Sequence, residues 1–158
     1  MIDRREFLGF VAFLGLCLAA SAVGAAATAS SVGNWYPSLA KPPFNPPNWV
    51  FAPVWTALFF MMAVAGWRVW RRDGLHRARL ALTLFAVQLV LNMSWSIVFF
   101  GLRSVGAALV VILVLLLAII ATTVVFWQRE RVAGMLFLPY LGWVAFATAL
   151  NAALWQLN

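Results

Sequence analysis

Long apolar runs separated by short polar links make up most of the chain. Five of these runs approach or exceed the roughly 20 residues with which a helix crosses the hydrocarbon core of a bilayer. They cover approximately residues 7–27, 48–70, 79–100, 105–127 and 132–155. All links except one are short, so consecutive helices are expected to be antiparallel neighbours. The pattern predicts an all-α integral membrane protein, one domain over residues 1–158 that forms a five-transmembrane-helix bundle.

The composition supports this prediction. Of the 158 residues, 65% are hydrophobic and only 9% are charged, and the mean hydropathy is +0.96. A soluble domain of this length would need far more polar surface, because it cannot hide so many apolar residues. The net charge of +7 does not indicate nucleic-acid binding, since the basic residues lie at the ends of apolar runs and form no separate basic domain.

The basic residues divide unequally between the two sides of the predicted bundle. Nine fall on the side of the amino terminus: Arg4, Arg5, Arg68, Arg71, Arg72, Arg77, Arg79, Arg129 and Arg131. The other side has only Lys41 and Arg103. Short cytoplasmic loops are enriched in Lys and Arg. We therefore expect a cytoplasmic amino terminus, with the link 28–47 and the carboxyl terminus outside, which in a bacterium means the periplasm.

The first apolar run has a second interpretation. It begins with "RREFLGF" and ends with "AVGAAATAS", which resembles a twin-arginine export signal with a small-residue cleavage site. Cleavage would leave four helices. The product would still be a polytopic membrane protein, an unusual cargo for that route, so we expect the first helix to be retained.

Ionisable side chains are found at helix ends and in links: Asp3, Glu6, Asp73, His76 and Glu130. A proton-coupled pump needs carboxylates or histidines at membrane depth. A haem-iron or metal site needs histidine or cysteine ligands, and the sequence has one histidine, in a link, and one cysteine, Cys17, inside the first apolar run. We therefore predict no metal site and no conventional acid–base enzyme.

Two predicted helices instead carry amides and aromatic rings on one face each. In the run 79–100, residues spaced by four, three and four positions share a face: Gln88, Asn92, Trp95 and Phe99. In the run 132–155, spacings of three, four and four positions align Tyr140, Trp143, Ala147 and Asn151. Amides that faced lipid would lack partners, so both faces are expected to point into the bundle. Together with Trp55, which comes early in the run 48–70, they predict a cavity.

Simpler interpretations remain open for several of these residues. Asn92 and Asn151 are equally well explained as hydrogen-bonding links between helices, worth about 1 kcal/mol each. Six tryptophans are typical of the belt at the membrane interface: Trp35, Trp49, Trp67, Trp70, Trp127 and Trp155. The run 105–127 has no polar anchor and is expected to face lipid or a partner subunit.

The one long link, residues 28–47, is rich in proline and tryptophan. Pro42, Pro43, Pro46 and Pro47 restrict the backbone and lower the entropic cost of ordering it. We expect a lid over the mouth of the bundle, with an apolar underside formed by Trp35, Tyr36, Phe44 and Trp49. A polyproline ligand for a partner domain fits less well, because the stretch is full of bulky rings.

Three blocks resemble the translocator protein family, known as tryptophan-rich sensory proteins in bacteria and peripheral benzodiazepine receptors in mitochondria. They are "WYPSLAKPPFNPPNWVFAPVWTALFFMMAVA", "QLVLNMSWSIVFFGL" and "LPYLGWVAFATALNAALWQLN". The resemblance runs from about residue 35 to the end. It implies a five-helix bundle, often a homodimer, that binds protoporphyrin IX, haem-type tetrapyrroles and synthetic benzodiazepine-receptor ligands beneath the first loop, with porphyrin as a ligand and no cofactor required.

Carried over residue by residue, the resemblance assigns a pocket of Trp35, Tyr36, Pro46, Trp55, Asn92, Trp95, Trp143, Ala147 and Asn151, beside which Phe99 and Tyr140 lie on the same helical faces. It also ties Trp55 and Trp143 to a light-dependent breakdown of protoporphyrin IX. Sterol binding is less expected, because "ATALNAALWQLN" lacks the tyrosine and arginine of the weak L/V…Y…K/R pattern. The favoured function is a membrane sensor of tetrapyrroles, and the alternatives are a passive porphyrin transporter and a light-dependent porphyrin-degrading enzyme.

Overall fold

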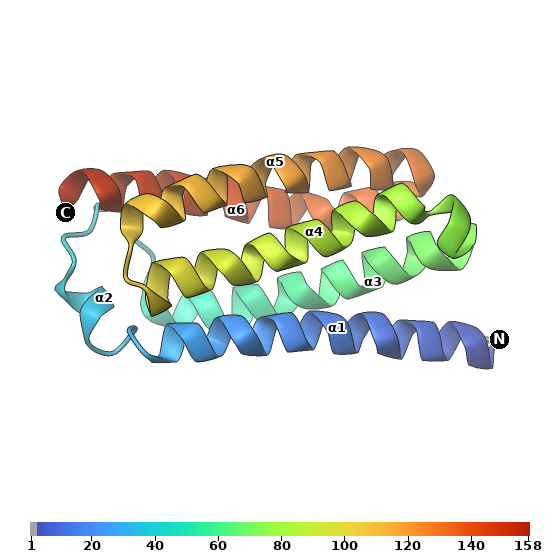
Figure 1. The fold of residues 1–158 in the computed structure, drawn as a ribbon, viewed down its shortest axis with the longest axis horizontal. Helices are drawn as coiled ribbons and strands as arrows, with labels where there is room; N and C mark the ends of the chain where they lie inside the picture. The colour runs from blue at the N-terminus through green and yellow to red at the C-terminus, as the bar shows by residue number, and fades with distance from the viewer. Residues whose placement is uncertain (1–2) are drawn as a thin grey trace.

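Helices form every regular element of the computed structural model, which describes residues 3–158. Five of them are long and apolar enough to cross a membrane, which confirms the predicted fold class. In chain order (Figure 1) the elements are α1 (Arg4–Ala29), α2 (Trp35–Ser38), η1 (Asn48–Val50), α3 (Phe51–Arg77), α4 (Arg79–Ser96), η2 (Ile97–Gly101), α5 (Val105–Arg129) and α6 (Arg131–Leu157).

The helices extend beyond the apolar runs that predicted them. The run 48–70 corresponds to α3, which continues to Arg77 instead of ending near residue 70. The run 79–100 corresponds to α4, which starts at residue 79 as expected. Backbone hydrogen bonding does not stop where hydropathy falls, since arginines are good helix formers. The helical path of α3 breaks only at Gly74, whose φ of 71° lies in the region that glycine tolerates best.

The long helices close a ring around a common core. α1 packs on α3, α3 on α6, α6 on α5, α5 on α4, and α4 on α1. Consecutive helices were expected to be neighbours, but α3 and α4 touch less extensively than the pairs of the ring. Their short link fixes only their adjoining ends. We call the end with the amino terminus and the α3–α4 and α5–α6 junctions the arginine end, and the opposite end, which carries α2, the α2 end (Figure 1).

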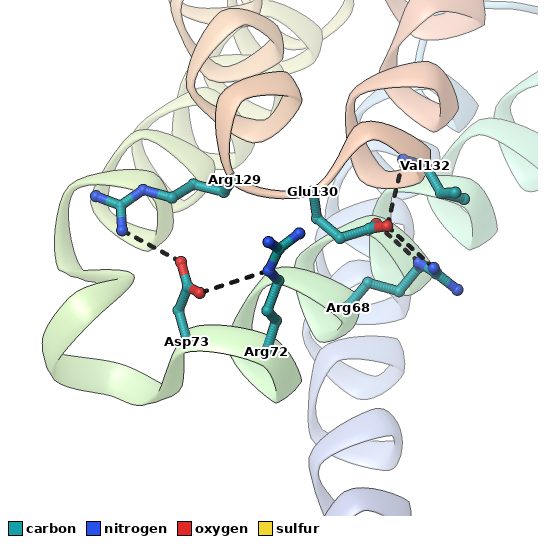
Figure 2. A network of polar contacts seen from close by, with 6 residues as sticks. All are labelled: Arg68, Arg72, Asp73, Arg129, Glu130 and Val132. Atoms are coloured by element: carbon teal, nitrogen blue, oxygen red, sulfur yellow. Dashed lines mark hydrogen bonds and ion pairs between the residues drawn. The ribbon is translucent and has the colours of Figure 1, made fainter.

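A network of ion pairs joins helices at the arginine end (Figure 2). Arg68 of α3 donates to both carboxylate oxygens of Glu130, at 2.8 and 3.1 Å. The same carboxylate caps α6 by accepting from the backbone N–H groups of Val132 and Ala133. Arg68 holds the pKa of Glu130 below its usual value, and the backbone N–H groups lower it further. One carboxylate therefore connects α3 to the α5–α6 junction.

Two further ion pairs extend this network. Arg129 donates to Asp73 at 3.2 Å (Figure 2), which joins the end of α5 to the end of α3. Arg71 donates to Glu6 at 2.9 Å and joins α3 to the first turn of α1. The arginine end is thus held together by polar contacts from four of the five long helices.

Aromatic rings fill the bundle between the arginine end and its middle. Phe85, Phe126, Phe137 and Tyr140 are all almost completely buried. The ring centroids of Phe126 and Phe137 are 5.0 Å apart, and those of Phe137 and Tyr140 are 5.8 Å apart. Aromatic pairs at these distances stabilise a core beyond their buried area. This aromatic block leaves the other half of the bundle for the site.

Candidate ligand cavity

A cavity of about 470 Å³ occupies the half of the bundle nearest the α2 end. Its volume lies in the range of small-molecule sites. Four long helices, α1, α3, α4 and α6, contribute to its wall, together with η1, η2, α2 and the residues around it. Its deepest wall residues on these helices are Ser21, Phe59, Asn92 and Trp143.

Small side chains on α1 leave space for the cavity. The wall residues from this helix are Ser21, Gly24, Ala25, Thr28 and Ala29. They repeat at spacings of three, one, three and one positions and therefore occupy a single helical face. Ala147 on α6 is another small residue of the wall. Large side chains at these positions would fill the space.

Aromatic rings face this small-residue wall from the other helices. Trp55 and Phe59 from α3 lie with centroids 5.8 Å apart, and Trp95 and Phe99 lie 5.4 Å apart. Trp143 from α6 is also part of the wall. Indole and phenyl faces offer broad, flat, polarisable surfaces, which suit planar apolar ligands.

The floor of the cavity is a buried hydrogen-bond chain. Asn92 Nδ2 donates to the Tyr140 hydroxyl at 2.9 Å, and that hydroxyl donates to Gln88 Oε1 at 2.8 Å. Gln88 Nε2 contacts the sulfur of Met62 at 3.7 Å. Asn92 lies on the cavity wall, whereas Gln88 and Tyr140 lie beneath it. These hydrogen bonds satisfy polar groups that lipid or an empty cavity would leave unpaired.

The second amide of the site also links helices. Asn151 Oδ1 accepts from Trp95 Nε1 at 3.0 Å, and its Nδ2 donates to the Val105 carbonyl at 2.9 Å. It thereby joins α6 to α4 and to the first residue of α5. The sequence left ligand contact and interhelical bonding as alternatives for Asn92 and Asn151. Both amides make the interhelical bonds and border the cavity as well.

The link between α1 and α3 meets the cavity at only a few points. From residues 30–47, Val32 and Tyr36 reach the wall. Tyr36 donates from its hydroxyl to Asn45 Oδ1 at 2.8 Å, and burial raises the pKa of its phenol. Trp49 is 73% exposed and lies outside the wall, so the expected apolar underside is smaller than the sequence indicated.

The residues predicted for the pocket divide into two groups. Eight lie on the cavity wall: Tyr36, Trp55, Asn92, Trp95, Phe99, Trp143, Ala147 and Asn151. Three do not. The ring of Trp35 packs behind the wall against Phe99, with centroids 5.7 Å apart. Pro46 accepts a hydrogen bond from Asn45 within the link, and Tyr140 lies beneath the floor.

Sequence reasoning missed the wall formed by α1. The signal was present, because small residues recur along "SAVGAAATAS", but the same run resembles a cleavage site. Asn48 of η1 and Phe100 of η2 were also missed, since neither falls on the helical faces that the spacing identified.

Five apolar helices long enough to span a membrane, four of which line an aromatic cavity, define a multi-pass, integral membrane protein. The chain belongs to the TspO/MBR family, which it matches over residues 13–156. A tryptophan-rich protein TspO from Archaeoglobus fulgidus is 43% identical over 153 residues, covering 97% of this chain and 99% of that protein.

Two other relatives have names that describe different roles. The tryptophan-rich sensory protein of Cereibacter sphaeroides is 41% identical over 149 residues, covering 94% of this chain and 90% of that protein. The human translocator protein is 40% identical over 127 residues, covering 79% of this chain and 75% of that protein.

Proposed function

We propose that this protein is a membrane receptor that binds a tetrapyrrole, protoporphyrin IX or haem, in the aromatic cavity and signals its abundance. The observation that carries the proposal is the wall itself, in which Trp55, Trp95 and Trp143 from three helices border one apolar space. A flat macrocycle stacked on indole rings gains about 0.5–1.5 kcal/mol for each aromatic contact beyond burial. The name of the sensory relative agrees with a sensor.

Metal-free porphyrin is the better expected ligand. The wall offers no imidazole or thiolate, which are the common axial ligands of haem iron. Its one phenol, Tyr36, donates to Asn45, and burial raises its pKa, which disfavours the phenolate that would ligate iron. We therefore expect protoporphyrin IX to bind at least as tightly as haem.

The cavity floor favours a receptor over a passive transporter. A porphyrin crossing the bundle would have to break the chain from Asn92 through Tyr140 to Gln88. It would then have to separate the packed rings of Phe85 and Phe137. Beyond the floor, the porphyrin would therefore meet these packed rings and not an open path. Protoporphyrin flux into proteoliposomes, measured alongside binding, tests this alternative, and flux that saturates with binding would favour transport.

Titration of the purified protein with protoporphyrin IX, followed by tryptophan fluorescence, tests the receptor proposal. We expect saturable quenching, with a Kd raised severalfold in Trp55→Phe and Trp143→Phe because each variant loses part of the stacking surface. Trp49→Phe is the matched control, since its side chain is mostly exposed and lies outside the wall. Quenching that never saturates, or an equal loss in all three variants, would argue against a porphyrin in this cavity.

Light-dependent degradation of protoporphyrin is a second candidate function. The observation that favours it is that Trp55 and Trp143 both border the cavity, from α3 and α6, where an indole next to an excited porphyrin can donate an electron. Illumination of the bound complex tests it. Loss of the porphyrin absorption should slow in Trp55→Phe and Trp143→Phe at saturating ligand, and unchanged rates would remove this function.

We infer from the charge distribution that the arginine end faces the cytoplasm. Nine of the eleven basic residues belong to that end, as the positive-inside rule expects. Single cysteines introduced at Arg77 and Phe44, in a chain whose Cys17 is replaced by alanine, test the orientation. A membrane-impermeant thiol reagent applied to intact cells should label the position in the link and spare the one in the α3–α4 junction.

A further inference from the structure

The charged side chains of the bundle are segregated. All four carboxylate side chains belong to the arginine end: Asp3, Glu6, Asp73 and Glu130. The α2 end carries two cations, Lys41 and Arg103. Within residues 3–158, every ion pair lies at the arginine end, and neither cation of the α2 end takes part in one. Two positive charges at the α2 end are therefore left without an ion pair in this part of the chain.

Lys41 lies next to the cavity wall. Its ammonium group is 5.1 Å from the ring centroid of Tyr36, and Tyr36 borders the cavity. The ammonium donates to the carbonyls of Pro37 and Leu39, both at 3.1 Å. An ammonium has three donors, so these bonds hold Lys41 beside Tyr36 and leave one donor free for an anion.

Arg103 is linked to the cavity wall through Ser31. Its Nε donates to Ser31 Oγ at 3.2 Å, and the Ser31 hydroxyl donates to the Phe100 carbonyl at 2.6 Å. Phe100 is a residue of the wall, and so is Val32, which follows Ser31. In the described chain the two terminal amino groups of this guanidinium make no hydrogen bond. Those amino groups form the fork that binds carboxylates in a bidentate manner.

The backbone of Arg103 has the left-handed conformation, which is strained for a residue with a side chain. Its φ is 54°, and it is the one non-glycine residue with positive φ among residues 3–158. The left-handed conformation costs an L-residue roughly 1–2 kcal/mol, a cost that glycine avoids. Strain of this kind is often kept where a side chain has a role.

We propose that Lys41 and Arg103 recognise the carboxylates of a tetrapyrrole whose ring occupies the cavity; this inference rests on the proposed function. Protoporphyrin IX carries two propionate groups on one edge of an otherwise apolar ring. Charged carboxylates are costly at membrane depth without partners. The propionate edge would therefore face the α2 end, between two cations, and the apolar edge would face the floor at Asn92.

The test compares protoporphyrin IX with its dimethyl ester, which has the same ring but no charge on the propionates. Both are titrated into the protein in phosphatidylcholine nanodiscs, which add no anionic lipid. For each ligand the Kd of a variant is divided by the Kd of the unaltered protein, so that partitioning into the bilayer cancels. Lys41→Gln and Arg103→Gln should each raise this ratio about three- to tenfold for the diacid and leave it near one for the ester.

Two variants separate charge recognition from folding. Arg103→Gly removes the guanidinium and relieves the positive φ, so it should bind the diacid as weakly as Arg103→Gln while its Tm does not fall. Arg103→Lys keeps a cation and should recover part of the affinity. Arg79→Gln at the arginine end, an exposed position far from the mouth, is the control and should behave like the unaltered protein with both ligands.

The outcomes distinguish failure of carboxylate recognition from failure of the proposed function on which it rests. If neither ligand binds saturably, the proposed function fails. If both bind and the variants shift the two ligands equally, or shift neither, carboxylate recognition is overturned while the tetrapyrrole site stands. A loss confined to the diacid, with recovery in Arg103→Lys, supports the pair of cations.

Discussion

A single hydroxyl group connects the two polar residues at the centre of the bundle. The Tyr140 hydroxyl accepts from Asn92 and donates to Gln88, and its side chain is fully buried. The Asn92 amino group and the Gln88 carbonyl oxygen both have this hydroxyl as their partner. The aromatic ring of Tyr140 belongs to the packed block below, while its hydroxyl forms part of the cavity floor.

Replacing Tyr140 by phenylalanine should destabilise the protein by about 1 kcal/mol, because it leaves buried amides without partners. The ring is kept, so packing against Phe137 is unchanged. Thermal unfolding in a fixed detergent measures the effect. In a double-mutant cycle, Gln88→Leu should cost less in the Tyr140→Phe background than alone. Strict additivity of the two losses would show that the hydroxyl and the amide act independently.

At the scale of the element, hydropathy predicted that the long helices exist but said little about where they end. An apolar run long enough to span a bilayer has one stable backbone solution, the helix, so α1, α3, α4, α5 and α6 followed directly. The short helix α2 and the π-helical turn η2 did not, since they depend on local hydrogen bonds. The capping of α2 by the Asn34 side chain is one such bond.

Helical spacing predicted only part of the candidate site, since Tyr36 and Trp55 were identified without a repeat. Trp95 and Asn92 on α4, and Trp143, Ala147 and Asn151 on α6, form such patterns and border the cavity. The small residues of α1 were interpreted as resembling a cleavage site, because an absence of side-chain bulk gives no direct signal for a cavity wall. Tyr140 shares the face of Trp143 but lies deeper, since the residues along one face differ in depth along the axis.

The α5–α6 pair provides a sharp test of helix packing. A Cβ atom added at Gly134 would lie 2.7 Å from the Trp127 Cα, so the two backbones would have to separate. We expect Gly134→Ala to destabilise the protein by about 1–3 kcal/mol. Gly142→Ala on the same helix is the matched control, since nothing lies within 4 Å of its added Cβ. It should be neutral or stabilising by up to about 1 kcal/mol, and Tm values in detergent decide between them.

At the scale of the whole molecule, the arginine end acts as a polar clamp on the bundle. Glu130 is its central group, because it pairs with Arg68 of α3 and caps α6 at the same time. Its pKa is lowered in the folded protein, first by the hydrogen bond from Arg68. The unfolded chain therefore takes up a proton at Glu130 at a higher pH than the folded chain does.

This linkage predicts a loss of stability in acid. A lowered folded-state pKa contributes stability that is fully present above the unfolded-state value of about 4.3 and is lost as the pH falls through the folded-state value. The Tm of the unaltered protein should therefore fall below about pH 4.3. Glu130→Gln should lose about 1 kcal/mol at pH 7 and show a shallower decline in acid. An identical decline in the variant would mean that other groups cause the acid sensitivity.

The aromatic block that separates the two halves of the bundle has an evolutionary consequence. Ion pairs and packed phenylalanines hold one half together, so substitutions in the cavity half change the shape of the cavity without carrying the main burden of folding. Such a division lets descendants of one ancestral bundle alter the cavity while they keep a common architecture. Relatives with the same core and different cavity walls are then the expected result of selection on the cavity alone.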